Sequence, residues 1–246
     1  MSKKLILFSG GMDSLAIMIE YLNKYGSHHI QSLGVNYGQR HFEQENKAAR
    51  RFCQKYSISR YILDIPLNQI GSSPLLDKTT PVTTNMDNQR STVVPQRNAI
   101  LLLFAAAYAE QNDCDTIVHG ACIEDYKAYR DCRDIFFELL TNTIQAGRTQ
   151  PKKGSEDILD DLNTYGELPE DKTDILIETP LINETKIETV KRIIGLYGVD
   201  VYVDSYTCYN GQELQCGVCP ACQERIAAFK ANGVTDPVKY AIDIEW

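Results

Sequence analysis

The segment from Ser9 to Ser14 has the residue types and spacing of a phosphate-binding site. It reads Ser-Gly-Gly-Met-Asp-Ser, follows an apolar run and leads directly into residues with helical periodicity. A strand that turns sharply into a helix leaves the first helical amides without partners, and such amides bind anions well. Gly10 and Gly11 allow a tight turn and a close approach of the backbone to a ligand. The segment therefore predicts a phosphate-binding loop.

Asp13 indicates which kind of loop this is. The common nucleotide-binding loop has a lysine after its second glycine, whereas here Asp13 stands two residues after Gly11. Because a carboxylate repels a polyphosphate unless a cation lies between them, Asp13 predicts Mg²⁺ bound with the phosphates. The segment resembles the pyrophosphate loop of the N-type ATP pyrophosphatases, which implies cleavage of ATP between its α and β phosphates. The simpler alternative is an ordinary strand, turn and helix in which Asp13 stabilises the helix N-terminus.

A cluster of cysteines near the C-terminus has the spacing of a metal site, C-x7-C-x2-C-x2-C. Its members are Cys208, Cys216, Cys219 and Cys222. Four thiolates at such spacings can complete a tetrahedral Zn²⁺ site with no open position, so we expect one structural zinc ion per chain. An iron–sulfur cluster is the main alternative. The other cysteines are expected to be small buried hydrophobic residues; they are Cys53, Cys114, Cys122 and Cys132.

Charged residues in the middle of the chain suggest a second binding region. Arg97, Asp125, Asp131 and Arg133 flank expected strand and helix ends. Carboxylates can accept hydrogen bonds from a guanine-like N1–H and amino group, and an arginine can pair with a substrate carboxylate. A network of surface salt bridges and helix caps is the alternative, and the residue types alone do not separate the two.

Apolar, β-rich runs alternate with helical patterns, which favours an α/β fold with a doubly wound parallel sheet. Strands are expected near Leu5–Phe8, Ser32–Asn36, Arg60–Ile65, Thr116–Ala121 and Asp174–Pro180. Helices are expected after Ser14 and near Phe42–Lys55, Ile100–Ala109, Asp131–Ala146 and Thr185–Tyr197, the last ending at Gly198 as a left-handed cap. Ligands bind at the carboxyl ends of strands in such sheets, so the Ser9–Ser14 loop and residues 120–133 should lie at one edge.

Two stretches lack clear periodicity. Residues 66–95 are rich in Pro, Ser, Thr and Asn and read as a lid, a binding loop or a disordered segment. Residues 147–173 are polar and acidic and read as a surface insertion. We expect a main domain over residues 1–204 and a small zinc-binding helical subdomain over residues 205–246.

The bulk composition excludes several classes of protein. The formal net charge of −8 argues against a large nucleic-acid interface, so direct nucleic-acid binding is not expected. The chain has neither a signal-peptide core nor a membrane-length apolar run, which predicts a cytoplasmic protein that binds no membrane. In that compartment the cysteines are expected to be reduced or bound to metal.

Further strings extend the resemblance over nearly the whole chain, from residue 5 to about 237. They are Ser9–Ser14, Tyr37–His41, Pro95 with Arg97–Asn98, Asp131–Arg133, Glu178–Leu181, Thr207–Gly211 and the Cys216–Cys222 cluster followed by Arg225. Together they resemble the QueC family of queuosine-precursor biosynthesis, within the adenine nucleotide alpha hydrolase type of Rossmann-like fold.

The resemblance implies an ATP-dependent ligase that converts 7-carboxy-7-deazaguanine and ammonia into 7-cyano-7-deazaguanine through an adenylated carboxylate and an amide, releasing AMP and pyrophosphate. It implies that ATP, with magnesium, lies against Phe8, Ser9, Gly10, Gly11, Met12, Asp13, Ser14 and Leu15. It assigns the deazaguanine to Arg97, Asn98, Asp125, Tyr129, Asp131 and Arg133. Asp13, Ser14 and Arg97 are the expected catalytic residues. The resemblance also implies a homodimer. Because no glutaminase module is visible, nitrogen should come from free ammonia or another amine.

The sequence departs from the family pattern around the expected base site. Gln96 replaces a usual Gly, Lys127–Asp131 replaces a usual Ser-Gly-Tyr-Pro-Asp string, and Ile123 replaces an acidic residue. One alternative is therefore a QueC-like ligase that joins the activated carboxylate to another amine, such as a protein N-terminus, with Lys127 and Arg130 contacting that partner. A tRNA-thiolating enzyme and a nucleotide-sensing module are further alternatives.

Overall fold

A parallel sheet of five strands in the order β3-β2-β1-β4-β5 forms the centre of the molecule. The computed structural model describes residues 2–71, 73–86, 91–148 and 174–246, and the expected surface insertion lies outside them from residue 149 onward. The strands are β1 (Lys3–Leu7), β2 (Ile30–Asn36), β3 (Ser59–Asp64), β4 (Cys114–Val118) and β5 (Leu176–Glu178). The parallel α/β architecture expected from the sequence is confirmed.

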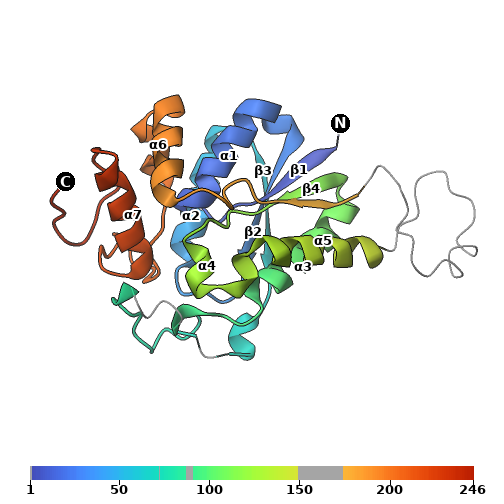
Figure 1. The fold of residues 1–246 in the computed structure, drawn as a ribbon, viewed down its shortest axis with the longest axis horizontal. Helices are drawn as coiled ribbons and strands as arrows, with labels where there is room; N and C mark the ends of the chain where they lie inside the picture. Colours follow the sequence, from blue (N-terminus) through green and yellow to red (C-terminus); the bar gives the residue numbers. More distant parts are fainter. Residues whose placement is uncertain (1, 72, 87–90, 149–173) are drawn as a thin grey trace, which may run out of the picture.

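Helices cover both faces of this sheet (Figure 1). They are α1 (Met12–Tyr25), α2 (Phe42–Lys55), α3 (Arg97–Gln111), α4 (Asp125–Ala128), α5 (Asp134–Ala146), α6 (Lys186–Tyr197) and α7 (Pro220–Ala231). Short 3₁₀ turns add η1 (Ser27–His29), η2 (Leu67–Gln69), η4 (Arg130–Cys132) and η6 (Val199–Asp204). Side chains of α1, α2, α6 and α7 share one buried cluster, whereas those of α3 and α5 share another. None of the helices in the described parts of the chain has the length and apolar content of a membrane span.

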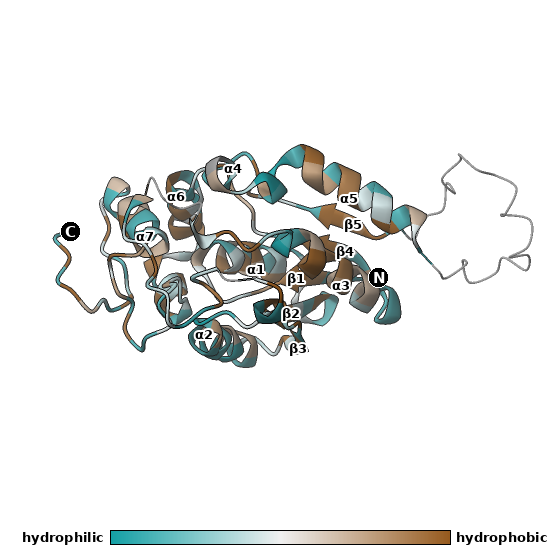
Figure 2. Cartoon of the chain, turned by 90° about the horizontal axis from the view of Figure 1, so that it is seen from below, coloured by the Kyte–Doolittle hydropathy of each residue, from teal (hydrophilic) through white to brown (hydrophobic). Residues whose placement is uncertain are grey.

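The alternation of side chains along β1 explains why there are two hydrophobic clusters. Ile6 and Phe8 belong to the cluster beneath α1, while Leu5 and Leu7 contact the one beneath α3. Successive residues of a strand point to opposite faces, so a strand covered on both sides must be apolar throughout. Figure 2 shows this pattern, with hydrophobic strands in the middle and a largely hydrophilic α2 at the rim.

Two helices begin at different residues from those expected. The helix α3 starts at Arg97 rather than near Ile100, and α5 starts at Asp134 rather than Asp131. The reason is one interaction: the Asp131 carboxylate accepts a hydrogen bond from the backbone amide of Asn98 at 3.1 Å, in the first turn of α3. Asp131 therefore caps the N-terminus of α3, and the separate turn η4 precedes α5. Gly198 follows α6 with φ 80° and ψ 163°, so the expected left-handed cap is wrong.

The long loop between β3 and α3 is packed against the sheet in its described parts. Leu75 is fully buried in a cluster with Tyr37, Ile65 and Val94. The guanidinium of Arg40 donates to the backbone carbonyls of Pro74, Lys78 and Thr80 in this loop. These contacts fix the described parts of the loop in place, and its expected role as a lid or binding loop stays a prediction.

We predict that Gly10→Ala destabilises the protein by at least about 2 kcal/mol. A Cβ at Gly10 would lie 2.5 Å from the Glu45 carbonyl oxygen and 2.9 Å from the Ala49 nitrogen, at a φ of +97° that L-residues rarely adopt. Urea unfolding measures the change. The matched control is Gly195→Ala in α6, where a Cβ meets nothing within 4 Å and a gain of about 0.5 kcal/mol is expected. Equal stability of the two variants would contradict this account.

Candidate active site

A cavity of about 250 Å³ opens where β1, β2 and β4 end. Each of these strands is followed by cavity-lining residues, as expected for an open parallel sheet. They include Ser9, Gly11, Met12, Asp13 and Ser14 after β1, Tyr37, Gln39 and His41 after β2, and His119 and Gly120 after β4. Later elements add Glu45, Arg97, Asn98, Asp125, Lys186, Tyr209 and Glu224.

The Ser9–Ser14 loop is held in shape by its own side chains. The Gly11 amide donates to Ser9 Oγ at 3.0 Å, and Ser14 Oγ donates to the Gly11 carbonyl at 3.1 Å. The Gly10 carbonyl accepts from the Tyr206 amide at 2.8 Å, which ties the loop to the C-terminal segment. Of the residues expected around ATP, Phe8, Gly10 and Leu15 do not line the cavity, and Phe8 and Leu15 are fully buried in the core.

A buried lysine faces this loop. Lys186 Nζ lies 2.6 Å from Glu224 Oε2 and 3.9 Å from Asp13 Oδ2. Burial raises the pKa of Asp13 to about 7, with Lys186 opposing the shift and Asp125 and Glu224 adding to it. Burial would lower the pKa of Lys186, but these carboxylates outweigh it and hold that pKa well above its usual value.

Asp13 is suited to bind a cation. Its Oδ1 atom is buried and has no hydrogen-bond partner among the described residues, and further carboxylates lie close enough to raise its pKa. Hard cations such as Mg²⁺ prefer carboxylate oxygens. An unpaired carboxylate oxygen beside a row of helix amides fits a metal held between protein and phosphate.

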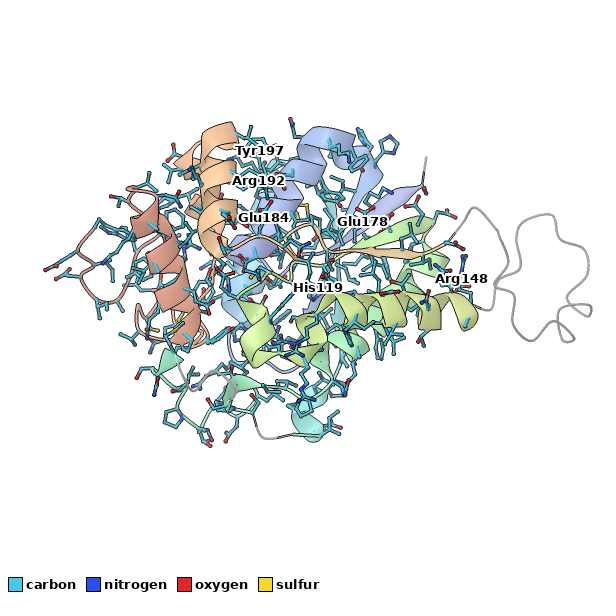
Figure 3. All side chains as sticks on the ribbon, viewed as in Figure 1. His119, Arg148, Glu178, Glu184, Arg192 and Tyr197 are labelled. Carbon is cyan, nitrogen blue, oxygen red and sulfur yellow. The ribbon has the colours of Figure 1, made fainter. Side chains whose placement is uncertain are left out.

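Sequence reasoning missed Lys186 and His119. Lys186 is the first residue of α6, whose capping box joins Thr185 and Glu188, and this cap was the available signal for a helix starting at the site. Figure 3 shows His119 at the centre of the molecule beside the end of β4, and Glu184 beside the start of α6. Burial lowers the pKa of His119 to about 4, and its Nδ1 accepts from the Ala121 amide at 3.1 Å. A neutral His119 therefore carries its proton on Nε2.

The residues expected to bind the base divide between two cavities. Arg97, Asn98 and Asp125 line the first cavity. Tyr129, Asp131 and Arg133 line a second cavity of about 570 Å³ instead. The Arg97 guanidinium lies 5.6 Å from the Tyr129 ring centre, so these two side chains meet at the boundary.

Some of these side chains also act as caps, as the alternative interpretation expected. Asp125 accepts a hydrogen bond from the Cys122 amide at 3.1 Å, and Asp131 accepts one from the Asn98 amide. Arg133 donates to the Tyr126 carbonyl at 3.4 Å. Capping at the edge of a cavity fixes these groups in place and leaves their free atoms for a ligand.

The four C-terminal cysteines form a buried cluster that could hold a metal ion. Their sulfur atoms all lie within 4.8 Å of one another, and all four residues are buried. Cys208 Sγ accepts from the amides of Asn210 and Cys216, and Cys216 Sγ accepts from the amides of Val218 and Cys219. Amide donors stabilise the thiolate charge that a metal requires. The other four cysteines are buried and unpaired, as expected.

We predict that Asp13→Asn changes how stability depends on pH. The folded pKa of Asp13 is raised from 3.8 to about 7, so the native state holds this proton more tightly than the unfolded state. The proton on Asp13 therefore stabilises the folded state at low pH, and this stabilisation is lost as pH rises from about 4 to about 7. The variant lacks this loss, so its stability relative to wild type should rise by roughly 2 to 3 kcal/mol between pH 5 and pH 8. Urea unfolding in chelator at both pH values measures it.

The exposed Asp200→Asn variant is the control for the change in net charge. A wild-type pH dependence in Asp13→Asn would show that the carboxyl is not desolvated.

Comparison with known proteins shows similarity over nearly the whole chain. The chain is 34% identical to 7-cyano-7-deazaguanine synthase of Hahella chejuensis, over 97% of this chain and 93% of that protein. It is 35% identical to the 7-cyano-7-deazaguanine synthase of Pseudoalteromonas translucida, over 97% of this chain and 98% of that protein. Among solved structures, NMN synthetase from Francisella tularensis aligns with a TM-score of 0.45 and 13% identity, covering 95% of this chain and 78% of that one, from which nothing further is drawn. The family described as "Queuosine biosynthesis protein QueC" matches residues 3–233, and the chain belongs to this QueC family.

Proposed function

We propose that this protein is a 7-cyano-7-deazaguanine synthase, an ATP-dependent ligase that forms carbon–nitrogen bonds. It converts 7-carboxy-7-deazaguanine and ammonia into the nitrile, and releases AMP and pyrophosphate. The observation that carries this proposal is the near-full-length similarity to synthases with that activity, at 34% and 35% identity. Residues of the Ser9–Ser14 loop and Arg97 also line the same cavity, which supports transfer of the adenylyl group from ATP held by the loop to a carboxylate held by Arg97, with pyrophosphate as the leaving group.

The first cavity is proposed to hold ATP beside the substrate carboxylate. The amides at the start of α1 and the hydroxyls of Ser9 and Ser14 receive the pyrophosphate, and Lys186 adds a positive charge. Such preorganised donors stabilise the charge that develops on the leaving pyrophosphate. Arg97 is proposed to hold the substrate carboxylate in line with the α-phosphate, because an arginine can pair with a carboxylate through two parallel hydrogen bonds.

Asp13 is the proposed ligand for Mg²⁺. The metal would supply positive charge to the polyphosphate, which the carboxylates of Asp13, Asp125 and Glu224 would otherwise repel. Lys186 forms ion pairs with two of these carboxylates, Glu224 and Asp13.

The Cys208, Cys216, Cys219 and Cys222 site is proposed to hold one structural zinc ion. The four sulfurs leave no position open for chemistry, and a cytoplasmic protein keeps such thiols reduced. We accordingly propose residues 205–246 as a zinc-binding subdomain next to a main domain of residues 1–204. The homodimer implied by the family resemblance is likewise a proposal.

A second candidate function is supported by the second cavity. Three of its lining residues, Gln96, Ala128 and Arg130, stand where the sequence departs from the usual family pattern. Gln96 adopts φ 56° and ψ 18°, a left-handed conformation that costs a non-glycine residue energy. Strain of this kind concentrates at functional sites. The alternative is therefore a ligase that joins the activated deazaguanine to another amine, such as a protein N-terminus, held in this cavity.

We predict that the mass of the reaction product identifies it as the nitrile. With ATP, magnesium, 7-carboxy-7-deazaguanine and ammonium, the wild-type protein should form the nitrile, whose mass differs from that of the amide by one water. AMP should appear only when the carboxylate is present. Asp13→Asn, whose cation-binding carboxylate is lost, is the inactive control.

Each outcome decides between the candidates. Release of AMP with only trace nitrile, together with a deazaguanine mass on an added peptide amine, would replace the first function by the second. No AMP release in the presence of the carboxylate would refute both.

We predict that Cys219→Ser releases the metal and unfolds the C-terminal segment. Structural zinc contributes its binding free energy directly to folding, on the order of 10 kcal/mol in small domains. Metal content by mass spectrometry and the melting temperature measure the effect. Cys114→Ser, another buried cysteine far from the cluster in sequence, should keep the metal. A Cys219→Ser protein with full metal content and an unchanged melting temperature would rule out the structural role.

A further inference from the structure

Two titratable side chains of the first cavity have no part in the function described so far. His41 directly precedes α2, and Glu45 lies in the first turns of the same helix. Both line the cavity, and His41 Nε2 lies 3.7 Å from Glu45 Oε2. They are four positions apart in the sequence, so they occupy one face of the helix start.

The backbone of Glu45 lies close to the Ser9–Ser14 loop. Its backbone carbonyl is the atom that leaves no room for a side chain at Gly10, at 2.5 Å from the Cβ position. On its other side, the His41 ring lies 5.6 Å from that of Tyr209. Glu45 therefore lies on a helix turn whose backbone touches this loop, and its side chain lines the same cavity as Arg97, the residue proposed to hold the substrate carboxylate.

Several groups face this carboxyl from the surrounding elements. Gln39 reaches it from the loop after β2, Arg97 from α3 and Arg60 from β3, and each lowers its pKa. Burial outweighs all three and raises the pKa of Glu45 to about 8. Burial also lowers the pKa of His41 to about 3, assisted by Arg97 and Arg40, so His41 is neutral at physiological pH. Near neutral pH the pair therefore gains or loses one proton, and Glu45 is the residue that carries it.

The other carboxylates of the cavity are already engaged. Asp13 and Glu224 face Lys186, and Asp125 accepts from the Cys122 amide. Among the described residues, the ion-pair contact of Glu45 is to the neutral His41 rather than to a lysine or arginine. Glu45 is therefore free to take up and release a proton.

We propose that Glu45 is the catalytic base that removes protons from the substrate nitrogen. The inference rests on the proposed synthase function and adds to it the group that accepts those protons. His119, whose Nδ1 is occupied by the Ala121 amide, presents only a donor and does not serve this role.

The proton count requires such a base at two stages. When ammonia attacks the acyl adenylate, a C–N bond forms, the C–O bond to AMP breaks, and one N–H proton passes to the Glu45 carboxylate. When a second ATP has adenylated the amide oxygen with release of pyrophosphate, the nitrogen loses both remaining protons as the C–O bond to AMP breaks and the nitrile forms. Glu45 takes these protons in turn and returns each to water.

The test separates adenylation from proton removal. The protein is given the amide of 7-carboxy-7-deazaguanine with Mg·ATP, and nitrile formation is followed in a single turnover from pH 6 to 9. The wild-type rate should rise with pH up to about 8. Glu45→Gln, which resembles the protonated side chain, should form nitrile at least on the order of 100-fold more slowly and lose the pH dependence.

Pyrophosphate exchange into ATP with the carboxylate and no ammonia reports adenylation alone. Glu45→Gln should keep this exchange, and the exposed Glu43→Gln variant in the same turn of α2 should match wild type in both assays. A wild-type nitrile rate and pH profile in Glu45→Gln, or an equal loss of exchange and nitrile formation, would overturn the proposal. Absence of exchange in the wild-type protein would instead refute the synthase function itself.

Discussion

The close approach of the Gly10 backbone to α2 brings together the parts of the site that come from distant segments. A Cβ at this position would meet the Glu45 carbonyl at 2.5 Å, so only glycine lets the loop lie this close to the helix. On the other side, the Gly10 carbonyl accepts a hydrogen bond from Tyr206, shortly before the first cysteine of the metal site. One turn of backbone thereby sets the position of the loop, of the titratable pair on α2 and of the C-terminal segment.

The charges of the site follow from this crowding. Three strands and several helix ends converge on a small volume, and their polar side chains lose contact with water there. Burial raises the pKa of Asp13 and of Glu45 and lowers that of His41 and His119. Lys186 stays charged because the surrounding carboxylates outweigh its own burial. A site that concentrates carboxylates in this way repels a free polyphosphate and accommodates one that carries a cation.

The sequence predicted the parallel sheet and most of its elements because apolar, β-rich runs alternate with helical patterns along the chain. The helix Phe42–Lys55 was predicted at both ends. The start of α5 was wrong because Asp131 caps α3, a contact between residues 33 positions apart that no local pattern contains. The mid-chain residues were expected to form a single site for the base. In the structure Arg97 and Arg133 line different cavities.

By itself, the sequence determined the features that depend on local spacing. The strand, the two glycines and the first helix turn follow one another in the chain and so predict a phosphate-binding loop, and the cysteine spacing brings four sulfurs together. Only the tertiary structure decided which distant side chains face that loop. Lys186, His119 and Glu45 reach the cavity because parallel strands end at a common edge, and their protonation is set by burial. Burial depends on all the elements that surround a group, so it cannot be read from the residues beside it in the chain.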